Sequence, residues 1–234
     1  MMQVKLRPLP QQVASVLVRR IAGGELPDGL APSEVQICIE FGVSRAVARE
    51  ALKILSALDI VDIAQGRRII VRPPDEWDYM SPLLVEWLPS PQVHELLKEL
   101  HEARLVFEPA IAAKAAQTLT DAGLARLADL LDAMAAHVDD PDRYLELDLE
   151  FHMEICRATR NRILDRFMYS SRWWQSASRR LSNRAPRALP EATKHHRKIY
   201  EALAARDPKR AAAAMREHLM LNTLLLMTDE EEVG

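Results

Sequence analysis

The chain has 234 residues, of which 48% are hydrophobic and 28% are charged, and its formal net charge is −3. These values are typical of a globular protein with room for two modest domains, and the overall charge does not point to a nucleic-acid partner. The charge is distributed unevenly, because residues 1–74 carry 10 basic and 7 acidic side chains whereas residues 75–234 carry 21 and 27. A basic first segment followed by an acidic one indicates a charged partner for the first segment.

The cysteines and the apolar runs exclude two further classes of protein. Cys38 and Cys156 lie far apart in the sequence, so they form no disulfide framework, and they suit a reducing cytoplasm. Arg19 and Arg20 interrupt the apolar run near the N-terminus, so we expect no signal peptide. The longest late apolar run, LMLNTLLLM, is too short to span a bilayer. We therefore expect a cytoplasmic protein with no membrane partner.

Three helical segments are expected before residue 60. The first ends at a pair of glycines, and the second opens with a capping-box pattern in which Ser33 and Gln36 are three residues apart. Gly42 can adopt the left-handed conformation that ends the second helix, and Ser44 can cap the third. The segments are QQVASVLVRRIAGG, SEVQICIEF and SRAVAREALKILSAL.

Two strand-like runs follow the third helix. The runs IVDIA and RRIIVRP are separated by Gln65-Gly66, which favours a tight β-hairpin. Helices, turn and hairpin in this order predict a winged helix-turn-helix domain. Pro73-Pro74 marks its expected end, so we predict that this domain occupies residues 1–74.

The third helix carries basic residues on one side and apolar residues on another. Arg45, Arg49 and Lys53 recur every four residues, and Arg45 lies in the first turn. In helix-turn-helix proteins this end enters the major groove, where arginine binds guanine or phosphates. Gly66 and Arg67 at the hairpin tip can follow a neighbouring groove or the DNA backbone. A solvated basic face is the alternative, but the cap, turn and hairpin around the stripe favour binding to double-stranded DNA.

Beyond Pro74 the sequence shows only helical periodicity, interrupted by turn signals. We expect about six or seven helices packed as one bundle. This ligand-binding and dimerisation domain would occupy residues 75–228, followed by a disordered acidic tail over residues 229–234. The predicted fold class is mainly α, with a winged helix-turn-helix followed by an all-helical bundle.

Four polar side chains lie on the apolar sides of predicted helices in this second segment. Asp148 and His152 are four residues apart and stack one turn above the other, while His196 and His218 lie on two later helices. A single such histidine is usually a core residue bonded to a carbonyl, but four groups on three helices that can face one axis favour a shared ion. These ligand types suit Zn²⁺, Ni²⁺, Mn²⁺ or Fe²⁺, and four protein ligands leave positions open on an ion with a larger coordination number.

Two neighbouring residues compete for places in this site. His195 is an alternative to His196, but lysines flank it and its face is more polar. Cys156 follows His152 by one turn and could be a thiolate ligand, although the role of a small buried apolar side chain is more common.

PSEVQICIEFGVSRAVAREALKIL and the later IAQGRRIIV resemble the N-terminal domain of GntR-type bacterial regulators. EARLVFEPAIAAKAA, DLEFHMEI and HHRKIYEALAARDPKRAAAAMREHL are similar to the FCD effector domain of the FadR subfamily. The resemblance implies a ligand-responsive transcription regulator, which we expect to be a repressor and not an enzyme. The DNA contacts that it implies are Arg45, Arg49 and Gly66, and Ser44 and Arg67 are further candidates. In the metal-containing branch of the subfamily the ligands of a divalent ion match Asp148, His152, His196 and His218, and zinc is the ion expected in the isolated protein.

The resemblance also implies an effector site beside the metal. Arg104 matches a family arginine that points into the same pocket, where a guanidinium can bind a carboxylate, and its alternative partner is Glu108 on the same helix. Asn222 follows His218 by one turn and could bind the ligand or simply pack between helices. EWDYMSPLLVEWL resembles the linker of regulators of sugar-acid catabolism, so we expect a small organic acid or sugar acid as effector. We expect a homodimer on a palindromic operator, with a metalloenzyme or a dedicated metal sensor as alternatives.

Overall fold

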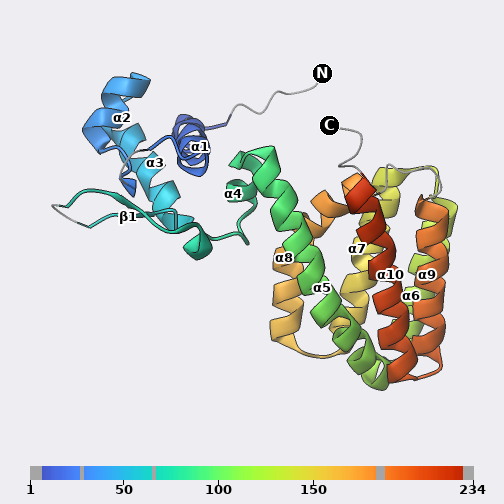
Figure 1. The fold of residues 1–234 in the computed structure, drawn as a ribbon. Coiled ribbons are helices and arrows are strands. Elements are labelled where there is room, and N and C mark those ends of the chain that lie inside the picture. Colours follow the sequence, from blue (N-terminus) through green and yellow to red (C-terminus); the bar gives the residue numbers. More distant parts are fainter. Residues whose placement is uncertain (1–6, 27–28, 65–66, 183–187, 229–234) are drawn as a thin grey trace. The chain divides into compact units, whose positions relative to one another are not determined.

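The computed structural model describes residues 7–26, 29–64, 67–182 and 188–228, apart from the side chains of residues 177–182, 188 and 222–228. The chain forms two compact units, residues 1–94 and residues 95–234. Helices make up most of both units, which confirms the predicted mainly α fold (Figure 1).

The first unit holds a helix-turn-helix and a hairpin. Its elements are α1 (Leu9–Ala22), α2 (Glu34–Phe41), α3 (Arg45–Ala57), β1 (Val61–Asp62), β2 (Ile70–Val71), a 3₁₀ turn (Pro74–Glu76) and α4 (Pro82–Trp87). β1 and β2 are antiparallel, with Val61 opposite Val71. This order is the winged helix-turn-helix expected from the sequence.

Local capping signals define the turn between α2 and α3. Ser33 and Gln36 form a reciprocal capping box at the start of α2, and Gly42 ends that helix in the left-handed region with φ of 62°. The Ser44 hydroxyl oxygen accepts a hydrogen bond from the Val47 amide at 3.4 Å. Each of these predicted signals is present, so the turn follows from local chemistry.

The paired strands are shorter than the apolar runs that predicted them, since each contains two residues. The backbone carbonyl of Ile69 accepts a hydrogen bond from the Ala31 amide at 3.0 Å, and Leu30 forms an isolated bridge with Ile70. The segment that contains the second strand therefore pairs with the first strand and also with the loop before α2.

The core of the first unit holds the three helices together. Leu17, Ile37 and Leu55, from α1, α2 and α3, are fully buried. The chain beyond the two prolines stays attached to this unit, because the Asp78 amide donates a hydrogen bond to the Leu58 carbonyl at 3.0 Å. The first compact unit consequently continues past residue 74.

The second unit is a bundle of long helices (Figure 1). They are α5 (Ser90–Thr118), α6 (Asp121–Ala136), α7 (Pro141–Ala158), α8 (Arg162–Ser182), α9 (Ala188–Ala204) and α10 (Pro208–Thr228). α5 begins in the first unit and continues into the second. None of the helices in the described part of the chain has the length and apolar content that crossing a membrane requires.

One apolar core joins the helices of the bundle. α7 packs against α6 and α8, and α9 packs against α10 and α6. Leu127, Phe151, Ile199 and Leu219, from α6, α7, α9 and α10, are fully buried in this core. Asp148 and His152 on α7 are buried as Phe151 is, so the buried side of this helix also carries polar groups into the interior.

Candidate functional site

α7 turns a carboxylate and an imidazole toward the interior of the bundle. The Asp140 side chain caps the helix by accepting a hydrogen bond from the Arg143 amide at 3.1 Å. Asp148 and His152, one turn apart, expose only 4% and 2% of their surface. A carboxylate buried to this degree is costly unless a proton, a cation or hydrogen-bond donors compensate it.

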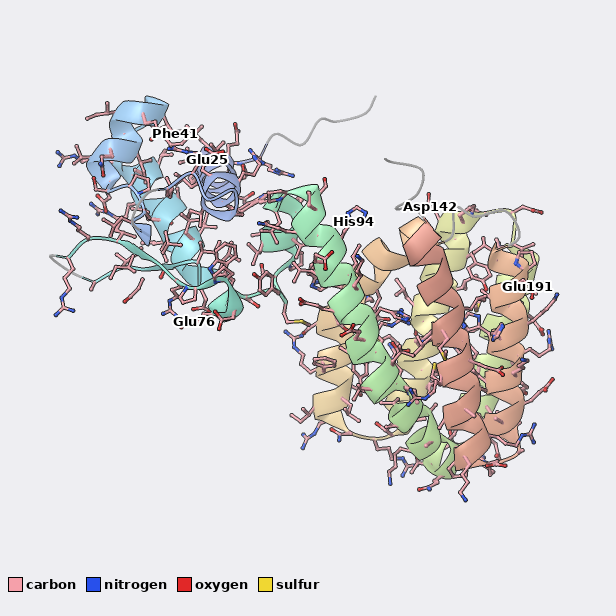
Figure 2. The ribbon with its side chains drawn as sticks, viewed as in Figure 1. Glu25, Phe41, Glu76, His94, Asp142 and Glu191 are labelled. Atoms are coloured by element: carbon pink, nitrogen blue, oxygen red, sulfur yellow. The ribbon has the colours of Figure 1, made fainter. Side chains whose placement is uncertain are left out.

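His196 on α9 and His218 on α10 meet this pair, and both are buried. One ligand atom from each of the four side chains lies within 4.8 Å of the other three. The centroids of the His196 and His218 rings are 4.2 Å apart. Figure 2 shows the ribbon of the bundle together with the described side chains of its helices. We call Asp148, His152, His196 and His218 the Asp/His₃ cluster.

The orientation of the His196 ring fits a metal ligand. Its Nδ1 lies 2.7 Å from the Ala192 carbonyl oxygen, which can only accept, so Nδ1 carries the proton. In the neutral form of the ring Nε2 carries the lone pair, and this atom lies 2.8 Å from Asp148 Oδ1. Two ligand atoms that are each about 2.0–2.2 Å from a zinc ion lie roughly 3 Å apart, so this separation suits two atoms that share one cation.

The His152 ring is oriented by a residue of another helix. Its Nδ1 donates a hydrogen bond to Glu108 Oε2 on α5 at 2.7 Å. Its buried Nε2 has no hydrogen-bond partner among the described residues and lies 3.9 Å from Asp148 Oδ1. A carboxylate that holds one ring nitrogen while the other faces the ion is the usual arrangement of a metal-bound histidine. The donor set therefore fits a divalent cation.

Arg104 and Glu108 form a buried ion pair behind this histidine. Arg104 Nε donates to Glu108 Oε1 at 2.5 Å, and both residues are 1% exposed. Burial alone would raise the pKa of the Glu108 carboxyl, but the charge of Arg104 and the hydrogen bonds from Arg104 and His152 lower it more. The pKa of Glu108 lies well below its usual range, so the side chain is ionised.

Arg104 combines two roles that the sequence leaves as alternatives. Its Nε pairs with Glu108, which is the alternative partner that the sequence predicts. Its Nη2 is buried and has no hydrogen-bond partner within the part of the chain that the structure describes. A buried guanidinium nitrogen without a partner is suited to receive an anion.

The link from Glu108 to His152 was missed by sequence reasoning, which treated Glu108 only as a partner for Arg104. A signal was nevertheless present, because His101, Arg104 and Glu108 are spaced by three and four residues and so share one face of a helix. All three are buried. Burial, and then the charge of Arg104, lower the pKa of His101, which keeps this imidazole neutral.

The two competing residues lie outside the Asp/His₃ cluster, which is the group found among the described side chains. His195 is half-buried, and its ring centroid lies 6.4 Å from that of His218. Cys156 is fully buried, and burial together with a hydrogen bond to Asp165 raises the pKa of its thiol to about 12. Cys156 therefore stays protonated and packs as an apolar side chain.

The predicted DNA-binding side of α3 is exposed. Ser44, Arg45 and Arg49 lie on it, and the opposite side of the helix packs into the core of the first unit. Arg49 makes two hydrogen bonds to Glu34 on α2, at 3.1 and 3.3 Å, which lowers the pKa of the Glu34 carboxyl. The Arg49 side chain is still 60% exposed, so α2 restrains it without covering it.

Three further predicted contacts lie at or beyond the limits of the described residues. Arg67 is exposed in the hairpin. Gly66 falls outside the described residues. Asn222 belongs to α10, but its side chain is also outside the description.

Two family models match the chain. Residues 9–71 match the model described as bacterial regulatory proteins, gntR family, and residues 99–220 match the FCD domain. The first match covers the winged helix-turn-helix. The second covers most of the bundle and the whole Asp/His₃ cluster.

Curated relatives match over most of their length. The galactonate operon transcriptional repressor of Escherichia coli K12 is 26% identical over 206 residues, which cover 87% of this chain and 90% of that protein. The regulator LutR of Bacillus subtilis 168 is 30% identical over 205 residues, covering 85% and 92%. The Glc operon transcriptional activator of Escherichia coli K12 is 28% identical over 228 residues, covering 93% and 89%.

Solved structures share the fold. A GntR protein of Streptococcus agalactiae matches with a TM-score of 0.50 and 26% identity, covering 90% of this chain and 97% of that one. Lar, which controls expression of the Listeria monocytogenes agr system, matches with a TM-score of 0.60 and 21% identity, covering 96% and 99%. The latter likeness concerns the fold alone.

Proposed function

This chain belongs to the GntR family of bacterial regulatory proteins and carries an FCD domain, and we propose that it is a repressor whose FCD domain binds a divalent metal ion and a small carboxylate effector. The coarser function is established by the family: the protein is a DNA-binding transcriptional regulator and not an enzyme. The metal, the effector and the direction of regulation are proposals.

GntR-family regulators bind DNA operators and are typically dimeric. For this chain we assign base or phosphate contacts to Arg45 and Arg49, with Ser44 at the helix start and the Gly66-Arg67 hairpin beside them. A single recognition helix reads few base pairs, so a homodimer on a palindromic operator would supply the remaining affinity. Binding to operator DNA in a bacterium supports a cytoplasmic location for the protein.

FCD domains are known to bind metals, and the Asp/His₃ cluster supports the same role here. The observation that carries this proposal is the buried, unpartnered Nε2 of His152, which faces Asp148 while Glu108 holds the other ring nitrogen. Three imidazoles and one carboxylate suit zinc and its first-row neighbours. Four protein ligands leave a position open to water or to an anion.

The effector would bind between this open position and Arg104. The buried Nη2 of Arg104 offers a charge-assisted hydrogen bond to a carboxylate, and Asn222 could add a polar contact. Similarity to the Escherichia coli galactonate operon repressor supports a sugar acid or another small organic acid. That relative and NanR of Klebsiella aerogenes are named repressors, which supports the proposed direction of regulation, although the Glc operon relative is an activator.

The signal would travel along a continuous helix. Arg104 and Glu108 lie on α5, which begins at Ser90 within the first compact unit. A ligand that repacks α5 against α7 would therefore displace a helix that both units share, and so change the spacing of two DNA-binding domains in a dimer. Coupling of this kind is reciprocal, because DNA must change the affinity for the effector by the same factor.

A thermal-shift screen of small carboxylates tests the proposal. The zinc-loaded wild type should be stabilised by at least one acid, and Arg104→Ala should lose that response while keeping its zinc. The same acid should change the mobility shift of DNA flanking the protein's own gene. If zinc alone changes DNA binding, and no acid changes either the melting temperature or the mobility shift, the protein is a dedicated metal sensor.

A further inference from the structure

The Glu34 side chain connects the two helices of the helix-turn-helix. It occupies the first position of α2, directly after the Ser33 cap, where the partial positive charge of the helix start favours a carboxylate. Its Oε1 accepts a hydrogen bond from Arg49 Nε at 3.1 Å, and its Oε2 accepts one from Arg49 Nη2 at 3.3 Å. Each carboxylate oxygen therefore has its own donor, which is the bidentate arrangement that fixes a guanidinium in orientation.

This contact uses one edge of the Arg49 guanidinium and leaves its outer end for another partner. A guanidinium has five N–H groups in one plane, and Glu34 takes one on Nε and one on Nη2. The groups that remain include the parallel pair formed by Nη1 and Nη2 at the end of the side chain. Arginine uses such a pair to donate two hydrogen bonds to O6 and N7 of a guanine in the major groove. The Arg49 side chain is exposed on α3, so a base edge can approach it.

An unrestrained arginine at this position would contribute differently to DNA binding. Its flexible side chain could reach the phosphates of any sequence, and such contacts strengthen binding without carrying sequence information. A guanidinium held in one orientation discriminates between bases, because both donors must meet correctly placed acceptors at the same time. Restraint by Glu34 thus favours base readout over phosphate binding.

We propose that Glu34 is a positioning residue of the DNA interface, which holds the Arg49 guanidinium so that its outer end reads a guanine of the operator. The inference rests on the proposed assignment of Arg49 as a DNA contact. Glu34 acts through Arg49 and need not touch the DNA. Its negative charge also repels phosphates, so Glu34 lowers the affinity for DNA of any sequence while it raises the preference for one sequence.

Selection from a library of random-sequence DNA duplexes by the full-length chain tests this role. Wild type defines the preferred base at each position, and Arg49→Ala identifies the position that Arg49 reads. Glu34→Gln should lower the preference for guanine at that position by about fivefold or more and leave the other positions unchanged. The same variant should bind the unselected library more tightly than wild type, because a negative charge has been removed.

Two control variants separate orientation from charge. Glu50→Gln removes the same charge from α3, where Glu50 pairs with Lys53, so it should tighten binding to the unselected library and keep every base preference. Arg49→Lys keeps the positive charge but has no planar pair of donors, so it should lose the preference for guanine. Adding Glu34→Gln to Arg49→Lys should cause no further loss of preference, which a residue that merely stabilises α2 would not explain.

The outcomes distinguish this inference from the proposed function. A Glu34→Gln variant that keeps the guanine preference, or an Arg49→Ala variant that weakens binding to all sequences equally, overturns the positioning role and leaves α3 as the DNA-binding helix. Binding that survives the combination of Arg45→Ala with Arg49→Ala removes the assignment of α3 and this inference with it. If Glu34→Gln does not fold, Glu34→Asp retains the charge but shortens the reach to Arg49, and an unchanged guanine preference in that variant would equally refute the role of Glu34.

Discussion

His196→Ala should abolish the stabilisation that zinc gives to the helical unit, whereas His195→Ala should leave it intact. His196 is fully buried, with Nε2 at 2.8 Å from Asp148 Oδ1, whereas His195 is half-buried and lies outside the Asp/His₃ cluster. The two residues are sequence neighbours of identical chemistry, so each is the matched control for the other. The comparison tests which face of α9 points to the ion.

The expected magnitude follows from linkage. An ion present at about 1,000 times its dissociation constant stabilises the folded state by about 4 kcal/mol. In a domain close in size to residues 95–234, each kcal/mol shifts the melting temperature by roughly 2–4 °C. A chelator should therefore lower the melting temperature of wild type and of His195→Ala by about 10 °C.

The assay compares each variant with itself, with zinc and with a chelator, so that the cavity left by a smaller side chain cancels. His196→Ala should show almost no difference between the two conditions, and elemental analysis should find no zinc after gel filtration. Full zinc content in His196→Ala, or its loss in His195→Ala alone, would refute the assignment of the ligands.

Three other predictions concern the first unit and the cysteines. Arg45→Ala combined with Arg49→Ala should abolish a mobility shift with operator DNA because both side chains lie exposed on α3, and intact binding would show that another surface reads the DNA. Ser33→Ala should destabilise the first unit by about 1 kcal/mol in denaturant unfolding, because the capping box is lost; an unchanged midpoint would mean that the cap contributes nothing. Cys156 is fully buried with a thiol pKa of about 12, so in the native protein a thiol reagent at neutral pH should leave it unmodified, and both Cys38 and Cys156 should react in denaturant. Native modification of Cys156, detected by peptide mass, would contradict its burial.

The features that sequence reasoning captured are those that local chemistry decides. Ser33 with Gln36, the left-handed Gly42 and the Ser44 cap act within a few residues, so they can be read without knowing the fold. The boundary between the two units, in contrast, is not decided by local chemistry. The pair Pro73-Pro74 does interrupt regular structure, but the hydrogen bond from the Asp78 amide to the Leu58 carbonyl attaches the following chain to the first unit. That attachment depends on a contact between residues 20 positions apart in the sequence.

The candidate site likewise has features that helix patterns predict and a feature that depends on tertiary packing. Asp148 and the three histidines could be grouped in advance because each lies on the apolar side of a helix, and apolar sides in one bundle share one interior. Each of the two carboxylate oxygens of Glu108 has its own partner. The first is Arg104, four residues away on the same helix, whereas the second is His152 on α7, 44 residues away, which only the packing of α5 against α7 brings into reach.

This second contact also explains why the buried charges occur as a set. Arg104 alone would be an uncompensated cation in an apolar core, and Glu108 alone an uncompensated anion, each costing several kcal/mol. Paired with each other they still leave Glu108 Oε2 to be satisfied, which His152 does, and this bond in turn directs His152 Nε2 toward Asp148. Each buried polar group in the series Arg104, Glu108 and His152 is thus stabilised by the next. The series ends at the ligand atoms of the Asp/His₃ cluster, where a divalent cation would supply positive charge.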